Sequence, residues 1–405
     1  MNSVMEAPSL RRLAWSLLMA LLMASCGGGG SSDGMSTGFA SEAQTQAQAA
    51  AAAPAISAEA KDAAAKVAAG GGEPAKAVAA ALASFQAFRA DRIQQVIVFG
   101  DSLSDVGTYK VGSIAQAGGG KFTTNPGPIW PETVGVLLGT SVRPFRQGFG
   151  GQSQISIPLG TGFAMGGARV SQQPGIGCNP DPVGACRAAL TFPVAQQIGD
   201  YLDTHGQRFD RTQMVFVFAG SNDLFFQLDR YAHGLQTAAE TQAAVVQAAV
   251  DLVGQLRRIV DHGATRVAVL TVPDLADTIA GRTLPLAIAA NLSAWVTDFN
   301  LTLTAGIGGG VKVIDTYAEF KQVVADPRRF GVSTLSLPAC DLEAIAEGSG
   351  QPLEDASSLF CSPLTLAELN APFQYFYADT EHPTTLGHLI IARFVLTEMY
   401  RQGLI

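Results

Sequence analysis

Short apolar runs alternate with longer amphipathic segments along the second half of the chain and part of the first. Four runs are apolar on both faces, as the buried strands of a parallel sheet are. They are QVIVFG (95–100), MVFVFAG (214–220), RVAVLTV (266–272) and VKVIDTY (311–317). Residues 241–263 and 286–307 lie between them and carry apolar side chains at helical spacing. Strands that alternate with helices predict an α/β domain, in which helices cover both faces of a parallel sheet.

The first 90 residues have a different pattern. Two arginines precede the apolar stretch LAWSLLMALLMA, which is too short to span a bilayer comfortably and is typical of a secretory signal. It ends in MASC, which resembles a bacterial lipoprotein signal. We therefore predict a signal peptide over residues 1–25 and lipidation of Cys26. The alternative is an ordinary secretory signal with a chance cysteine.

This leader predicts export to the outer membrane of a Gram-negative bacterium, anchored through the lipid on Cys26, with secretion as the alternative. Residues 26–90 are rich in Gly, Ala, Gln and Ser. We predict a low-complexity tether there, partly disordered and with one or two marginal helices. We expect residues 91–405 to form the folded domain that follows the tether.

The cysteine count supports export. Setting Cys26 aside leaves four cysteines, and an even set in an oxidising compartment indicates disulfides. Four cysteines allow three pairings, of which we expect the two between sequence neighbours, Cys178–Cys186 and Cys340–Cys361. Metal ligation is the weaker alternative, because none of these cysteines has CxxC spacing or a close histidine.

Composition excludes one class of partner. Of the 405 residues 47% are apolar and 15% are charged, which provides ample material for a core. The formal net charge of −8 argues against nucleic acid as a partner. Nothing in the sequence implies a cofactor or a metal, and a monomer is the default expectation.

The first strand leads directly into a serine, Ser102, in the stretch GDSLSDVG. In open α/β sheets ligands bind at the carboxyl ends of the strands, where GSND (220–223) is also placed. A serine hydroxyl is a poor nucleophile until a base takes its proton, so the chain must also supply a histidine. Four of the five histidines fit structural roles better. They are His205, His233 and His262 in turn-like contexts and His388 within an apolar helix.

His382 differs from these because it lies in YADTEHPTT, three residues after Asp379. Pro383 disfavours helical geometry at His382, which predicts a loop just before a helix. From such a loop Asp379 can curl back to the imidazole nitrogen that faces away from the serine, and orient the ring. Glu381 is too close in sequence to point the same way. The spacing alone leaves a structural role open.

Two further motifs suggest donors for an oxyanion. Asn222 follows a strand, and its amide can donate to a developing negative charge or cap a helix. Gly166 and Gly167 in GFAMGGARV allow a backbone N–H to approach a reacting centre, or form a common turn. We expect Asp101 and Asp105 to shape the serine turn and cap the following helix. The aromatic residues Tyr109, Phe122 and Trp130 either line an acyl pocket or belong to the core.

In chain order, GDSL, GGA, GSND and DxxHP each fall at a predicted loop. At this point the chain resembles the GDSL or SGNH hydrolase family, in its bacterial lecithinase/hemolysin-type branch. The resemblance implies the three-layer α/β/α SGNH fold (flavodoxin-like), with a parallel five-stranded sheet. It implies Ser102 as nucleophile, His382 as base and Asp379 as its orienter. The oxyanion would be held by the backbone N–H groups of Ser102 and Gly167 and by the Asn222 side chain.

The implied function is that of a serine esterase or lipase, which forms an acyl-enzyme from carboxylic esters or phospholipids. Acyl transfer to an alcohol is the alternative within the same chemistry. A non-catalytic surface lipoprotein that has kept the fold is a third hypothesis, which the presence of every expected catalytic residue disfavours.

Overall fold

The computed structural model describes residues 93–150, 155–178, 186 and 188–405. The predicted signal peptide, the lipidation site Cys26 and the tether up to residue 90 lie outside the described residues. They therefore remain predictions. Among the residues that are described, no helix is both long and apolar enough to cross a membrane.

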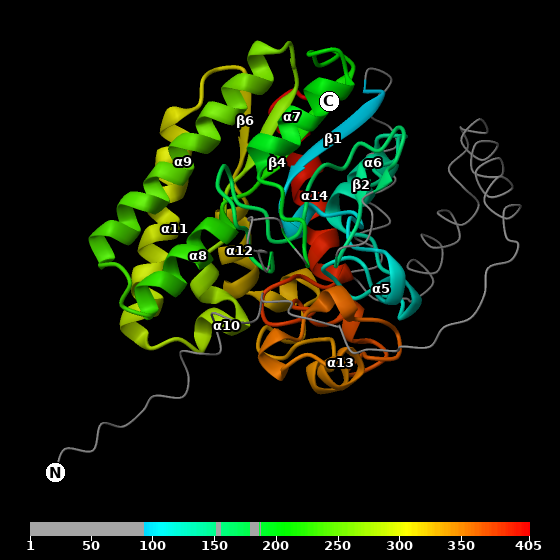
Figure 1. Ribbon diagram of the computed structural model, residues 1–405, viewed down its shortest axis with the longest axis vertical. Helices are drawn as coiled ribbons and strands as arrows, with labels where there is room; N and C mark the ends of the chain where they lie inside the picture. The colour runs from blue at the N-terminus through cyan, green and yellow to red at the C-terminus, as the bar shows by residue number, and fades with distance from the viewer. Residues whose placement is uncertain (1–92, 151–154, 179–185, 187) are drawn as a thin grey trace, which may run out of the picture. The chain divides into compact units, whose positions relative to one another are not determined.

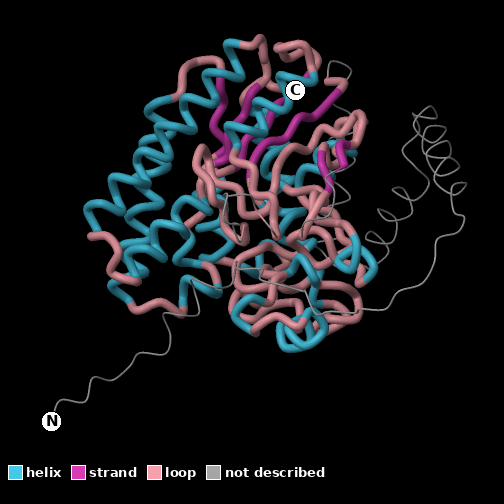
Figure 2. Tube along the Cα trace, in the orientation of Figure 1, coloured by secondary structure: helices cyan, strands magenta, loops and turns pink. Residues whose placement is uncertain are grey.

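Four parallel strands form the central sheet, in the order β1-β4-β5-β6. They are β1 (Gln95–Gly100), β4 (Gln213–Phe218), β5 (Val267–Leu270) and β6 (Val311–Ile314). Each lies within one of the four apolar runs or begins one residue before it, and in Figure 2 they lie side by side. The register pairs Ile97 with Val215 and Val215 with Val267. The predicted parallel α/β sheet is thus confirmed.

A fifth, extended segment continues the sheet beyond β1. Val98 pairs with Gly162 in a parallel bridge. The N–H of Val98 donates to Thr161 at 3.0 Å, and the N–H of Phe163 donates to the Val98 carbonyl at 2.8 Å. This segment takes the fifth position that the family resemblance implied, although it is too short to count as a regular strand. Beside it, β2 (Arg146–Gln147) and β3 (Ile155–Ser156) form a small antiparallel pair.

The α-helices of the described chain are α5 (Gly112–Gln116), α6 (Trp130–Leu137), α7 (Val194–Thr204), α8 (Ser221–Ala232), α9 (Ala238–Asp261), α10 (Ile279–Arg282), α11 (Leu286–Gly306), α12 (Thr316–Ala325), α13 (Leu342–Ser349) and α14 (Thr385–Arg401).

Helices cover both faces of the sheet. One face packs Ile97, Phe99 and Val215 against residues of α7, α9 and α11. On the other face Trp130 of α6 meets Phe216 edge to face at 5.3 Å. Figure 1 shows the strands between the green-to-yellow helices α7, α9 and α11 and the red helix α14. The three-layer α/β/α arrangement agrees with the expectation.

Between α12 and α14 the chain runs largely through turns and short 3₁₀ helices, with α13 as its one α-helix (Figure 2). Little regular structure supports this region, and a disulfide between Cys340 and Cys361 cross-links it. A second disulfide joins Cys178 and Cys186. Both predicted pairings are therefore confirmed.

Candidate active site

Ser102 stands at the carboxyl end of β1, on a sharp turn. A side chain at Gly100 would lie 2.1 Å from the Phe218 carbonyl oxygen, so glycine is required where β1 runs against the end of β4. Asp101 then caps a single 3₁₀ turn (Ser102–Ser104), because its Oδ1 accepts the N–H of Leu103 at 3.1 Å. Ser102 is therefore held at the start of a rigid turn, with 7% of its surface exposed.

His382 reaches Ser102 from the far end of the chain. Its Nε2 atom lies 2.9 Å from Ser102 Oγ, and its Nδ1 atom lies 2.8 Å from Asp379 Oδ2. An ionised carboxylate can only accept hydrogen bonds, so Nδ1 carries the proton and the Nε2 lone pair faces the serine. This is the tautomer that a general base needs. The loop ahead of α14 places His382 as the Asp-x-x-His-Pro spacing predicts.

The Asp379 carboxylate is saturated with donors. Besides the imidazole, its Oδ1 accepts the N–H of Glu381 at 2.9 Å and that of His382 at 2.7 Å. Its Oδ2 accepts the N–H of Ser358 at 2.8 Å. The side chain of Glu381 does not share this arrangement, as its position in the sequence suggested. Four donors, the imidazole Nδ1–H and three backbone N–H groups, thus fix one orientation of Asp379 and, through it, of His382.

Electrostatics reinforces this geometry. Burial opposes ionisation of Asp379, but the charge of His382 and the hydrogen bonds from His382 and Ser358 hold its pKa well below the usual range. Burial also disfavours a charged His382, yet the Asp379 carboxylate, with Glu381 and Asp101, raises the pKa of His382. An ionised orienter beside a more basic imidazole suits proton abstraction from a serine.

The three aromatic side chains considered in the sequence separate into two groups. Tyr109 and Trp130 are completely buried, so they belong to the core. Phe122 is buried as well, but its ring contacts the His382 ring at a centroid distance of 4.9 Å. It covers one face of the imidazole and restricts its rotation.

The candidate oxyanion donors gather around the Gly166–Val170 segment, hereafter the glycine loop. Asn222 lies in the first turn of α8, where its amide donates to the Ala168 carbonyl at 2.9 Å and keeps a second hydrogen free. It does not cap a helix. Among the described residues, neither the N–H of Ser102 nor that of Gly167 donates to another group. The N–H groups of Ser102 and Gly167 and one amide hydrogen of Asn222 are therefore without an acceptor in the described part of the chain.

The expectation for Asp105 is confirmed in part. Asp105 shapes the serine turn, because its Oδ1 accepts the N–H groups of Gly107 at 2.9 Å and Thr108 at 2.7 Å, but it does not cap a helix. Its Oδ2 accepts the N–H of Gly166 at 2.8 Å, so it joins the serine turn to the glycine loop. The two oxygens of a carboxylate have enough lone pairs for all three hydrogen bonds. The sequence around Asp105 does not indicate its contact with Gly166, which is distant in the chain.

The other histidines stay away from Ser102. His205, His233 and His262 are the C-caps of α7, α8 and α9, which agrees with their turn-like sequence context. His388 is fully buried in α14, and burial lowers its pKa to about 3. It accepts a hydrogen bond from the Trp130 N–H at 3.4 Å through Nδ1. Each therefore has a structural explanation.

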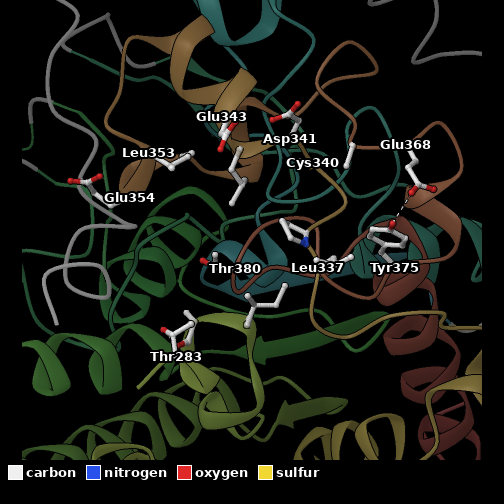
Figure 3. A pocket seen from close by; sticks show the side chains of 16 residues that line it. Thr283, Leu337, Cys340, Asp341, Glu343, Leu353, Glu354, Glu368, Tyr375 and Thr380 are labelled. Carbon is white, nitrogen blue, oxygen red and sulfur yellow. Dashed lines mark hydrogen bonds between the residues drawn. The ribbon is translucent and has the colours of Figure 1, made fainter. Parts of the chain in front are cut away.

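A separate cavity of about 720 Å³ borders the segment that carries Asp379 and His382. Thr380 and Tyr375 line it, and Figure 3 shows the Tyr375 hydroxyl bonded to Glu368 at 3.1 Å. Ser102 and His382 are not among its lining residues. Four carboxylates and no basic side chain line this cavity, so it is unsuited to an anionic product such as a fatty acid. The described residues contain no cluster of three or more His, Cys, Asp or Glu side chains that could hold a metal ion.

The sequence did not indicate two of the contacts that define the site. Ser358 acts through its backbone N–H, which any residue but proline provides, so no sequence signal exists for it. Phe122 is one of many apolar residues ahead of α6, and only the fold places it on His382.

Comparison with known proteins agrees with this arrangement. The sequence profile described as GDSL-like lipase/acylhydrolase matches residues 96–395. An uncharacterized protein in the trpE-trpG intergenic region of Pseudomonas putida is 26% identical over 333 residues, which cover 78% of this chain and 50% of that protein. The chain thus spans about half the length of this relative. Because the profile covers far more than half of the chain, the protein belongs to the GDSL-like lipase/acylhydrolase family, a family of ester hydrolases.

Proposed function

We propose that this protein is a serine esterase, in which Ser102, His382 and Asp379 hydrolyse carboxylic esters through an acyl-enzyme. The contact that carries the proposal is the 2.9 Å distance between Ser102 Oγ and His382 Nε2. The Nε2 lone pair of the imidazole faces the serine, and four donors fix the carboxylate that orients the ring.

The first half-reaction follows from these positions. His382 Nε2 takes the proton from Ser102 as Oγ forms a bond to the ester carbonyl carbon. The electron pair of the carbonyl moves to its oxygen, which the N–H groups of Ser102 and Gly167 and the Asn222 amide stabilise. When the tetrahedral adduct collapses, the bond to the alcohol oxygen breaks. His382 gives its proton to that oxygen, and the acyl group stays on Ser102.

The second half-reaction repeats these roles with water. His382 removes a proton from water as the oxygen attacks the acyl carbon, and the same donors stabilise the second oxyanion. When this tetrahedral adduct collapses, the bond between the acyl carbon and Ser102 Oγ breaks, and His382 returns the proton to Oγ. The products are an alcohol and a carboxylic acid. If another alcohol takes the place of water, the same site transfers the acyl group instead.

An apolar acyl group is the substrate part that the site favours. Phe122 next to His382 belongs to a buried cluster with Met165 and Leu190, against which the half-buried rings of Phe149 and Phe192 pack. The exposed parts of these two rings suit a hydrocarbon chain better than a sugar or a short acid. We therefore propose lipid esters, including phospholipids, as the substrate class.

The decisive experiment compares wild type with Ser102→Ala on p-nitrophenyl esters of increasing chain length and on defined phospholipids. Products are identified by mass spectrometry, with and without an added alcohol. We expect acid release by wild type and none above background by Ser102→Ala. Ser104→Ala is the matched control, because Ser104 lies in the same turn and its buried hydroxyl has no hydrogen-bond partner among the described residues. Activity retained in Ser102→Ala would refute the mechanism, and acyl-alcohol products would identify a transferase.

We also propose that a lipid on Cys26 attaches the exported protein to a membrane. The proposal rests on the MASC motif and on the two disulfides, which form in oxidising compartments. Cys26→Ala is expected to move the protein from the membrane fraction to the soluble fraction after cell lysis. An unchanged distribution would contradict lipidation.

A further inference from the structure

The glycine loop has no regular secondary structure, yet it carries one of the three oxyanion donors. Gly167 has a φ of +75°, and a side chain there would lie 2.0 Å from the Ile176 carbonyl oxygen. The loop therefore cannot gain rigidity from larger side chains at this position. An oxyanion hole works only when its donors are held in place before the charge develops. Other residues must supply that restraint.

Two buried carboxylates hold the loop at its ends. At the start, Asp105 Oδ2 accepts the N–H of Gly166 at 2.8 Å. At the end, Asp223 Oδ2 accepts the N–H of Val170 at 2.9 Å, and Asp223 Oδ1 accepts from Arg169 Nε at 3.2 Å. Asp105 is fully buried and Asp223 is 1% exposed. Such charge-assisted hydrogen bonds, shielded from water, are stronger than ordinary ones.

The two carboxylates come from the elements that supply the other donors. Asp105 lies three residues after Ser102, in the same turn, and its Oδ1 accepts two backbone N–H groups there. Asp223 follows Asn222 in the first turn of α8. The Asn222 amide itself bonds the middle of the loop at Ala168. The loop is thus tied at three points to the two elements that provide the remaining donors.

Arg169 provides the counter-charge for the second carboxylate. It is buried, pairs with Asp223, and its guanidinium lies 4.1 Å from the centre of the Phe226 ring. A buried charge without its partner is strongly unfavourable, so the ion pair between Arg169 and Asp223 stays formed. Because Arg169 belongs to the loop and Phe226 to α8, the stacking adds a fourth link between them.

We propose that Asp105 and Asp223 are positioning residues for the oxyanion hole, which set the glycine loop against Ser102 and Asn222. The inference rests on the proposed function, since it assigns the three donors to one oxygen. Both carboxylates are buried, and their oxygen atoms accept hydrogen bonds from protein groups. Their effect reaches the reaction through the position of the Gly167 N–H and of the Asn222 amide.

The test uses Asp105→Asn and Asp223→Asn, which keep the shape of the side chain and replace one acceptor by a donor. The matched control is Asp274→Asn. Asp274 is a buried carboxylate that pairs with Lys321 and makes no hydrogen bond to the glycine loop. The concentration of active enzyme is measured by titration with a fluorophosphonate. A variant that folds incompletely is then not mistaken for one with a lower kcat.

For both variants we expect kcat per active site to fall about 10- to 100-fold, with KM changed less than about threefold. The inhibition constant of a trifluoromethyl ketone, whose adduct places an oxyanion in the same hole, should rise by the same factor. In a protein that already carries Asn222→Ala, Asp223→Asn should lower kcat by a much smaller factor than it does in wild type. The reason is that both substitutions act on the same oxyanion hole. Asp274→Asn should leave kcat and the inhibition constant near those of wild type.

Hydrogen–deuterium exchange provides a measurement that is independent of activity. Peptides covering residues 163–176 should exchange faster in Asp105→Asn and Asp223→Asn than in wild type or Asp274→Asn. Unchanged exchange in these peptides, or unchanged kcat and inhibition constant per active site, would overturn the proposal. A wild-type protein without esterase activity would refute the proposed function, and the exchange rates would still decide whether the two carboxylates hold the loop.

Discussion

Ser102 Oγ and His382 Nε2 lie 2.9 Å apart, although 280 residues separate them in the chain. The first follows β1, and the second lies in the loop ahead of α14. The contact exists only when the sheet, both helical layers and the irregular region between α12 and α14 are in place. Activity of this protein is therefore a sensitive report on its complete fold.

Removal of one oxyanion donor gives the first prediction. Asn222→Ala should lower kcat by about 10²–10³-fold with little change in KM, because its amide acts on the transition state. Steady-state kinetics on a p-nitrophenyl ester measure both constants. Asn291→Ala serves as control, since the Asn291 amide donates to the Tyr231 hydroxyl and makes no hydrogen bond to the site. A loss below about tenfold would show that the amide contributes little to the chemistry.

A second prediction concerns the backbone donor at Gly167. Gly167→Ala introduces a methyl group 2.0 Å from the Ile176 carbonyl oxygen, so the glycine loop must shift. We expect a loss in kcat of about 100-fold. Gly206→Ala is the matched control, because Gly206 also has a positive φ (+65°) but open space around its Cβ position. If both variants lost the same activity, the strained φ and not the displaced donor would be responsible.

The pH profile tests the electrostatics of the base. His382 must be neutral to accept a proton, so kcat/KM should fall as the pH drops through its pKa, which lies above the ordinary value of 6.5. Glu381, whose own pKa burial raises to about 7, contributes to that increase. Glu381→Gln removes a negative charge beside the imidazole and should move the acidic limb to lower pH. A limb that stays in place or moves upward would contradict this account of His382.

Loss of the Cys340–Cys361 disulfide should affect both stability and activity. The N–H of Cys361 donates to the Ser358 carbonyl, and the N–H of Ser358 donates to Asp379 Oδ2. On the other side of the bridge the N–H of Cys340 bonds the Ala378 carbonyl at 2.9 Å. The double variant Cys340→Ala/Cys361→Ala should lose about 3 kcal/mol in free energy of unfolding. Its kcat should also fall.

The control for this prediction is Cys178→Ala/Cys186→Ala, which removes the other bridge. Cys178 and Cys186 make no hydrogen bond to Asp379 or His382 among the described residues. Chemical denaturation gives the stability and steady-state kinetics give kcat. Equal losses of kcat in both double variants would show that the Cys340–Cys361 bridge has no special relation to Asp379.

Much of this architecture could be predicted from the sequence, since its signals are local. Buried parallel strands are short apolar runs, and each of the four predicted runs coincides with a strand, although β4 begins one residue earlier than predicted. The resemblance of the motifs supplied the family and located Ser102, Asp379 and His382, which the structure brings together. The remaining details depend on contacts between distant segments. The fifth sheet position is held by a single bridge at Gly162, too short for any periodicity.

Other missed features follow the same rule. Asp379 accepts the backbone N–H of Ser358, and Asp105 accepts the backbone N–H of Gly166. Because every residue except proline has a backbone N–H, the residue type does not indicate which N–H groups make such contacts. The amide of Gln197 bonds both the N–H and the carbonyl of Gly100. It thereby secures the end of β1, yet a glutamine on a helix is ordinarily a surface residue.

The order in which the site residues occur has a consequence for synthesis. A ribosome makes the serine turn, the glycine loop and the Asn222 segment first, and these three already contain all the proposed oxyanion donors. The base and its carboxylate come last, after β6 and the cross-linked region. On the proposed mechanism, a growing or prematurely ended chain that lacks residues 379–382 is inert towards esters, and hydrolysis begins only after most of residues 93–405 have been translated.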